Sequence, residues 1–186
     1  YEILRCLVGS EMCIRDRMQT VACFGDSLIY GFPFGPRISW LAEAEKLTGD
    51  KFLNYGVCGD CTDDILSRLQ TMPLPAHIKH ILFLGGVNDI IQMRPQKFIL
   101  EDLDKTLRYC QSKNFVLGMV LPLVTSESSL NEYILLLREA ISARFAERAW
   151  LLDLQPAVGL TAAERKKAYL DLSLIHISEP TRHLRI

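Results

Sequence analysis

A serine that follows a short apolar segment is the first residue of this chain whose setting suggests chemistry. Ser27 lies in the sequence FGDSLIYGF, directly after the apolar, β-branched segment 20–25, which predicts a strand. A hydroxyl at the end of a strand can attack an acyl carbon, provided that hydrogen-bond donors stabilise the developing oxyanion. The sequence therefore raises acyl transfer as a candidate reaction, with Ser27 as its nucleophile.

Two further segments carry residues that can donate hydrogen bonds to such an oxyanion. Gly59 lies in GVCGDCTDD (56–64), and Asn88 lies in GGVND (85–89). A glycine lets the backbone approach a substrate closely, and an asparagine amide is a neutral donor that keeps its protons near pH 7. We expect the backbone N–H groups of Ser27 and Gly59 and the side-chain amide of Asn88 to converge on one oxygen atom.

The elements that must position these residues alternate along the chain between strands and helices. Apolar, β-branched runs predict five strands, at 20–25, 51–56, 80–86, 115–122 and 149–154. Amphipathic or capped segments predict helices at 37–49, 62–72, 95–113, 128–148 and 161–170. This alternation predicts an α/β fold, with a five-stranded parallel sheet in the order 2-1-3-4-5 and helices on both faces. A site in such a sheet lies beyond the carboxyl ends of the strands, where the three polar segments fall.

The three polar segments together resemble the first three sequence blocks of the GDSL/SGNH hydrolases. They occur in the family's order and with family-like spacing, and the resemblance covers essentially all of 19–171. It implies a flavodoxin-like, three-layer α/β/α fold. It also implies a serine hydrolase that acts through an acyl-enzyme on small esters such as acyl esters, acetyl sugars, lysophospholipids or thioesters. By its position in these blocks, Ser27 resembles the family's nucleophile, and Gly59 and Asn88 resemble its oxyanion donors.

The family's last block, Asp-x-x-His, is matched only in part. Asp171, in YLDLSLIH, stands where the family's aspartate orients the histidine that takes the serine proton, so we expect it to be the triad's acid. The next histidine, His176, comes five residues later rather than three. We therefore expect the native catalytic histidine to be missing and the printed chain to be impaired. Ile29 and Cys61 also depart from the family, because similar members often have threonine there.

The two ends of the chain are related to each other rather than to a folded domain. The segment LSLIHISEPTR at 172–182 can be back-translated into DNA whose reverse complement encodes Leu7–Arg17, and this DNA resembles a transposase-type sequencing adapter. Chance similarity is the alternative, but the match runs over many codons. We predict a C-terminally truncated hydrolase domain at 18–171, with adapter-derived, non-native tails at 1–17 and 172–186.

Composition excludes several classes of function. A chain of 186 residues with a net charge of -1 and 49% hydrophobic residues predicts one globular domain and argues against a nucleic-acid partner. No apolar run is long enough for a membrane span. The irregular spacing of the six cysteines indicates free thiols, hence a cytoplasmic protein unless an N-terminal leader has been lost. We expect a small-molecule ester as partner, with no metal and no cofactor, and the sequence leaves the oligomeric state open.

Each candidate residue also has a purely structural interpretation. Ser27 can cap a helix after the first strand, Gly59 can serve a turn, and Asn88 can begin a turn or a helix. Asp26 and Asp153 are also candidates for the catalytic acid, but we expect both to have structural roles. For the whole protein, two alternatives to the ester hydrolase stay open: an acyltransferase acting through the same acyl-enzyme, and a non-catalytic binding domain on the same fold.

Overall fold

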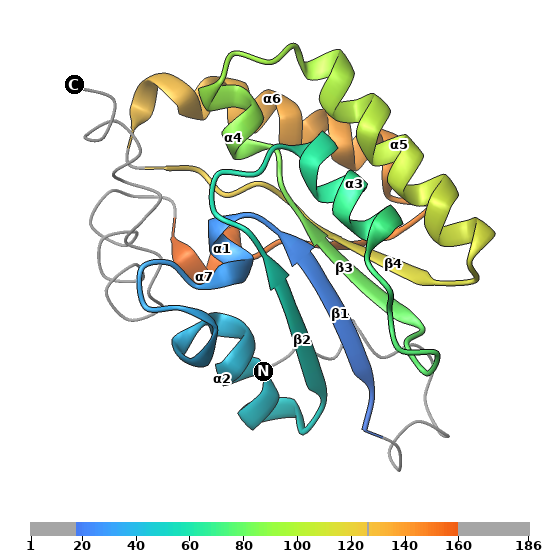
Figure 1. Ribbon diagram of the computed structural model, residues 1–186. Helices are drawn as coiled ribbons and strands as arrows, with labels where there is room; N and C mark the ends of the chain where they lie inside the picture. The colour runs from blue at the N-terminus through green and yellow to red at the C-terminus, as the bar shows by residue number, and fades with distance from the viewer. Residues whose placement is uncertain (1–17, 126, 160–186) are drawn as a thin grey trace.

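A parallel sheet forms the centre of the protein in the computed structural model, which describes residues 18–125 and 127–159 (Figure 1). Every strand pair is parallel, and the strand order is β2-β1-β3-β4-β5. The strands are β1 (Thr20–Gly25), β2 (Lys51–Gly56), β3 (His80–Leu84), β4 (Val116–Val120) and β5 (Trp150–Leu152). The predicted fold class, strand number and strand order are thereby confirmed.

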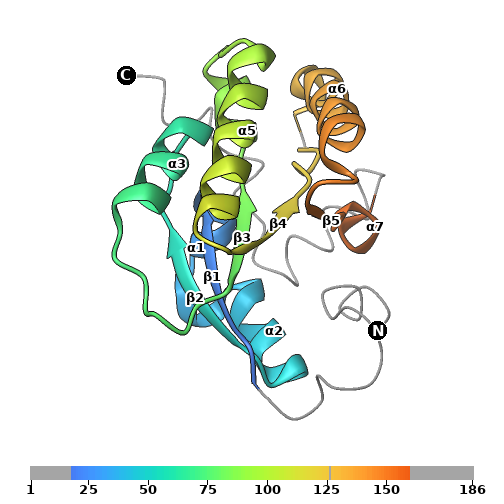
Figure 2. The same ribbon diagram turned by 90° about the vertical axis from the view of Figure 1, so that its right-hand side faces the viewer.

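Helices cover both faces of this sheet (Figures 1 and 2). Side chains of α3, α5 and α6 pack on one face, and side chains of α1 and α2 pack on the other. The helices are α1 (Ser27–Tyr30), α2 (Trp40–Thr48), α3 (Thr62–Thr71), α4 (Val87–Ile91), α5 (Gln96–Ser112), α6 (Ser128–Phe145) and α7 (Gln155–Val158), with a 3-10 turn, η2, at Pro36–Ile38. None of the helices within the described ranges is long and apolar enough to cross a membrane. The helix predicted at 161–170 lies outside those ranges.

Side chains along each strand alternate between two apolar cores. In β1, Ala22 and Phe24 face the core beneath α3, α5 and α6, whereas Cys23 faces the core beneath α1 and α2. β3 continues the pattern, with Phe83 in the first core and Leu84 in the second. Burial on both faces explains why the inner strands read as nearly continuous apolar runs in the sequence.

The carboxyl ends of three strands meet at one edge of the sheet, where α1 and α4 begin (Figure 1). The last residue of β1, Gly25, lies opposite Gly56 of β2 on one side and Leu84 of β3 on the other. The loops that carry the three polar sequence segments therefore leave the sheet from neighbouring positions.

Candidate active site

Ser27 begins α1, and its neighbour Asp26 caps this helix. The Asp26 Oδ1 atom accepts a hydrogen bond from the backbone N–H of Leu28 at 2.9 Å. The interpretation of Ser27 as a helix cap is therefore wrong, and the expectation that Asp26 serves structure is met by this contact. Ser27 is half-buried, and no hydrogen bond among the described residues uses its hydroxyl or its backbone N–H.

Glycines at the strand ends allow α1 to lie directly against the sheet. A Cβ atom at Gly56 would lie 2.2 Å from the backbone nitrogen of Tyr30, and one at Gly25 would lie 2.4 Å from a side-chain carbon of Ile29. Asn54 in β2 donates its side-chain amide to the carbonyl of Ile29 and accepts the N–H of Gly56. Ile29, one of the two departures from the family pattern, is fully buried in the apolar core. These contacts hold the last two residues of α1 against the ends of β1 and β2, and so position the helix that Ser27 begins.

Gly59 lies in the exposed loop between β2 and α3. Its φ angle is +88°, in the left-handed region that favours glycine. A Cβ atom at this position would meet nothing within 4 Å, so backbone conformation rather than lack of space calls for glycine. The N–H of Gly59 takes part in no hydrogen bond within the described part of the chain.

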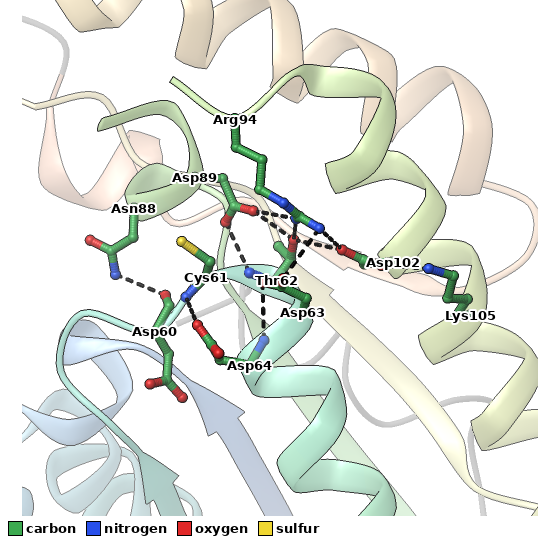
Figure 3. A network of polar contacts seen from close by, with 10 residues as sticks. All are labelled: Asp60, Cys61, Thr62, Asp63, Asp64, Asn88, Asp89, Arg94, Asp102 and Lys105. Carbon is green, nitrogen blue, oxygen red and sulfur yellow. Dashed lines mark hydrogen bonds and ion pairs between the residues drawn. The ribbon is translucent and has the colours of Figure 1, made fainter. Parts of the chain in front are cut away.

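Asn88 lies in α4, and its side chain reaches the loop that contains Gly59. The Asn88 Nδ2 atom donates to the backbone carbonyl of Asp60 at 2.9 Å (Figure 3). This bond uses one of the two amide hydrogens and fixes the plane of the amide. The second hydrogen has no partner between residues 18 and 125 or between 127 and 159. The structure thus brings Asn88 beside the residue that follows Gly59.

A buried network of ion pairs joins α3, α4 and α5 next to these residues (Figure 3). Asp89 accepts hydrogen bonds from the backbone N–H and the hydroxyl of Thr62, at 2.9 and 2.8 Å. Arg94 donates to Asp89 at 2.7 Å and also pairs with Asp102, which Lys105 contacts at 2.9 Å. Asp89 is fully buried. The sequence motif GGVND, which drew attention to Asn88, did not indicate that Asp89 contacts Thr62 and Arg94.

One group of side chains has the composition of a metal site. Cys61, Asp63 and Asp89 offer ligand atoms within 4.8 Å of one another. Both oxygens of Asp89 already accept hydrogen bonds from Thr62 and Arg94, and the guanidinium of Arg94 repels a cation. Burial raises the pKa of the Cys61 thiol to about 12, so the thiolate that a metal prefers is disfavoured. This donor set does not fit a metal ion.

The electrostatic environment of Asp26 is unusual for a carboxyl. Its side chain is 1% exposed. Burial raises the pKa of the Asp26 carboxyl to about 7, the nearby charges of Asp89 and Asp60 add to the shift, and the hydrogen bond from Leu28 opposes it. A carboxyl with this pKa is largely protonated in mildly acidic solution. Asp153 serves structure, because it accepts hydrogen bonds from Arg138 and from the backbone N–H of Gln155.

The expected acid of the triad and the histidine that follows it are not among the residues that the structure describes. Asp171, His176 and the tail predicted at 172–186 lie beyond residue 159, and the tail predicted at 1–17 lies before residue 18. The histidines within the described ranges are His77 and His80. His80 begins β3, and His77 precedes it, so both lie toward the amino edge of the sheet rather than the edge that carries Ser27.

Comparisons with known proteins agree with this architecture. Residues 23–180 match the GDSL-like Lipase/Acylhydrolase family. A protein of the lipolytic G-D-S-L family from Desulfitobacterium hafniense DCB-2 is 22% identical, with a TM-score of 0.71 over 78% of this chain and 82% of that chain. AlinE4, an SGNH-hydrolase family esterase, is 19% identical, with a TM-score of 0.66 over 95% and 100% of the two chains. At such identities the solved structures show a shared fold, and a search of the curated proteins found no match.

Proposed function

Because this chain belongs to the GDSL-like lipase/acylhydrolase family, we propose that it hydrolyses a small ester through an acyl-enzyme on Ser27. One observation carries the proposal: three hydrogen-bond donors, on α1, on the loop between β2 and α3 and on α4, have no partner in the described part of the chain. They are the N–H groups of Ser27 and Gly59 and the second amide hydrogen of Asn88. Donors whose positions the fold fixes and whose hydrogens other protein groups do not use suit an oxyanion.

The proposed reaction has two halves. In the first, the Ser27 hydroxyl oxygen attacks the carbonyl carbon of the ester while its proton passes to a base. The carbonyl oxygen becomes an oxyanion that accepts hydrogen bonds from Ser27, Gly59 and Asn88, and it reverts to a carbonyl when the alcohol leaves with the proton. In the second half, water attacks the acyl-serine, the same base accepts and returns a proton, and the carboxylic acid leaves. The donors stabilise charge that exists only near the transition state, so their contribution appears in kcat.

We propose that the base and the acid that orients it come from residues beyond 159. Asp171 is the proposed acid, in keeping with the family's Asp-x-x-His block. His176 stands five residues after it rather than three. For this reason we propose that the printed chain works poorly as a catalyst, and that its full activity needs a histidine at the position of Leu174.

The test uses a restored protein, in which a family-like tail carrying Leu174→His replaces the residues from 172 onward. Ser27→Ala should abolish hydrolysis of 4-nitrophenyl acetate, because it removes the nucleophile. Asn88→Ala removes one donor, so a residual rate should remain, with kcat lower by roughly 10²–10³. Mass spectrometry should detect an acyl group on Ser27 in the parent protein. Equal, mild effects of both substitutions would argue against covalent catalysis at Ser27.

Two other results would redirect the proposal. A restored protein that binds esters without turning them over would favour a non-catalytic binding domain. Formation of a new ester in the presence of an added alcohol, at the expense of hydrolysis, would favour an acyltransferase.

A further inference from the structure

One arginine contacts the backbone at the ends of two strands and the loop between β2 and α3. Arg68, in α3, donates its Nη2 hydrogen to the carbonyl of Gly25 at 3.0 Å and its Nη1 hydrogen to the carbonyl of Tyr55. Its Nε and Nη2 atoms also lie 2.8 and 2.7 Å from one carboxylate oxygen of Asp60. This guanidinium therefore joins the end of β1, the end of β2 and the loop that follows β2.

The contacts continue from this loop to α4. The carboxylate of Asp60 pairs with Arg68, and its backbone carbonyl accepts the amide of Asn88 at 2.9 Å. Gly59 directly precedes Asp60 in the chain. The hydrogen bonds thus run without interruption from Gly25 through Arg68 and Asp60 to Asn88.

The chemistry of Arg68 suits a residue that connects several backbone segments by hydrogen bonds. A guanidinium is planar and holds five N–H donors in a fixed fork, so it can satisfy several acceptors at once. The side chains of Arg68 and Asp60 are 22% and 15% exposed, and an ion pair shielded to this extent holds its geometry better than a surface pair. Through Asp60 these contacts tether the loop whose preceding residues, Val57, Cys58 and Gly59, are all exposed.

We propose that Arg68 is a positioning residue that sets the geometry of the oxyanion hole without touching the substrate. The inference rests on the proposed function, because it assigns Arg68 a role in the same site. The three proposed donors, Ser27, Gly59 and Asn88, lie on the segments that the contacts of Arg68 and Asp60 connect. A displacement of about 1 Å can cost as much as 10²-fold in rate. Loss of Arg68 therefore lowers kcat and leaves KM nearly unchanged, since the donors act on charge that develops after binding.

The first experiment measures ester hydrolysis by Arg68→Gln in the restored protein. We expect kcat to fall roughly 10- to 100-fold, with KM within about threefold of the parent value. Arg144→Gln is the matched control: Arg144 also pairs with a buried carboxylate, that of Asp104, but it joins α5 to α6 and contacts none of these loops. This control should leave both constants unchanged. An unchanged kcat in Arg68→Gln would overturn the proposal.

A double-mutant cycle separates positioning from general destabilisation. If Arg68 acts through the oxyanion hole, Asn88→Ala costs much less in the Arg68→Gln protein than in the parent, because the amide is already misplaced. In the Arg144→Gln protein, Asn88→Ala should cost its full factor. Effects of Arg68→Gln and Asn88→Ala that simply multiply would overturn the proposal.

A second readout, on the full printed chain, needs no turnover. Nitrogen-15 NMR follows the backbone amide of Gly59 and the side-chain amide of Asn88. Both signals should shift or broaden in Arg68→Gln and stay in place in Arg144→Gln, and unchanged signals in a folded Arg68→Gln protein would overturn the proposal. If Arg68→Gln does not fold, Arg68→Lys replaces it with the same expectations, because lysine keeps the charge but not the fork. If the signals respond while the restored protein hydrolyses no ester, the proposed function fails, but the inference that Arg68 positions Gly59 and Asn88 is retained.

Discussion

At the scale of single residues, Asp26 is a carboxyl that the fold almost removes from water, one residue before Ser27. Burial raises its pKa to about 7, so the folded protein keeps this proton to a higher pH than the unfolded chain does. Between about pH 4, where an unfolded aspartate titrates, and pH 7, the folded state binds more protons. We therefore predict that Asp26 lowers the free energy of unfolding as the pH rises through this window, with no further change above it.

Asp26→Asn isolates this effect, because asparagine keeps an oxygen that accepts the N–H of Leu28 and does not titrate. Urea unfolding at a series of pH values should show the wild type losing stability relative to the variant from about pH 4 to pH 7. Parallel pH profiles for the two proteins would mean that the Asp26 carboxyl titrates normally in the folded state.

Gly56 and Gly59 lie three residues apart, and their replacement by alanine should have different consequences. A Cβ atom at Gly56 would lie 2.2 Å from the backbone of Tyr30, so α1 would have to move. We predict a loss of about 1–3 kcal/mol or more in unfolding free energy for Gly56→Ala. A Cβ atom at Gly59 meets no neighbour, and the cost is the positive φ alone, about 1–2 kcal/mol.

The kinetic prediction for Gly59→Ala is more severe than its stability cost. A change in φ turns the N–H that is proposed to face the oxyanion, so kcat in the restored protein should fall while most of the molecules stay folded. Unfolding curves and kcat measured on the same preparations check both statements. A Gly59→Ala protein with normal kcat would remove Gly59 from the oxyanion hole.

At the scale of elements, the long helices and the strands were predictable because burial imposes a regular pattern on the sequence. The bounds of β1 and β2 agree with the predicted 20–25 and 51–56. Of the short helices, α1 and α4 stood only as alternative interpretations of Ser27 and Asn88, and α7 was not predicted, since a single turn has no period and depends on its surroundings. The cap of α1 by Asp26 and the positive φ of Gly86 before α4 are such local conditions.

The residues that position the candidate site could not be identified from the sequence. Ser27 and Asn88 stand in recognisable motifs, but the contacts that fix their loops connect distant parts of the chain. Asn54 reaches Ile29 across 25 residues, and Arg68 reaches the end of β1 across 43. Only the folded sheet brings such pairs together, so the sequence alone did not indicate them.

The network around Arg94 predicts a large effect on stability. Asp89 and Asp102 are almost completely buried, and Arg94 is the cation that contacts both. Arg94→Met leaves Asp89 with its Thr62 hydrogen bonds but without a counter-charge, so we predict a loss of about 3–5 kcal/mol in unfolding free energy. Lys97→Met, which removes an exposed pair with a 3.8 Å separation, should cost less than about 1 kcal/mol. Urea unfolding of both variants checks the contrast, and similar losses would contradict it.

At the scale of the whole molecule, the described ranges contain a proposed nucleophile and proposed donors at the carboxyl edge of the sheet, but their histidines lie toward the amino edge. A serine hydroxyl is a weak nucleophile unless a base lies within hydrogen-bond reach. We therefore expect catalysis at Ser27 to depend on the part of the chain beyond residue 159.

The printed chain and the restored protein should accordingly differ in catalysis by a large factor. Removing the histidine of a serine triad can cost about 10⁶ in kcat, and His176 stands two residues beyond the family's position for it. We predict that kcat/KM for 4-nitrophenyl acetate is several orders of magnitude lower for the printed chain, and that His176→Ala lowers it little further, because a misplaced imidazole contributes little. Ser27→Ala in the restored protein supplies the background rate. If the printed chain equals the restored protein in kcat/KM and His176→Ala changes nothing, then Ser27 takes its activation from a group other than the Asp171 and histidine pair.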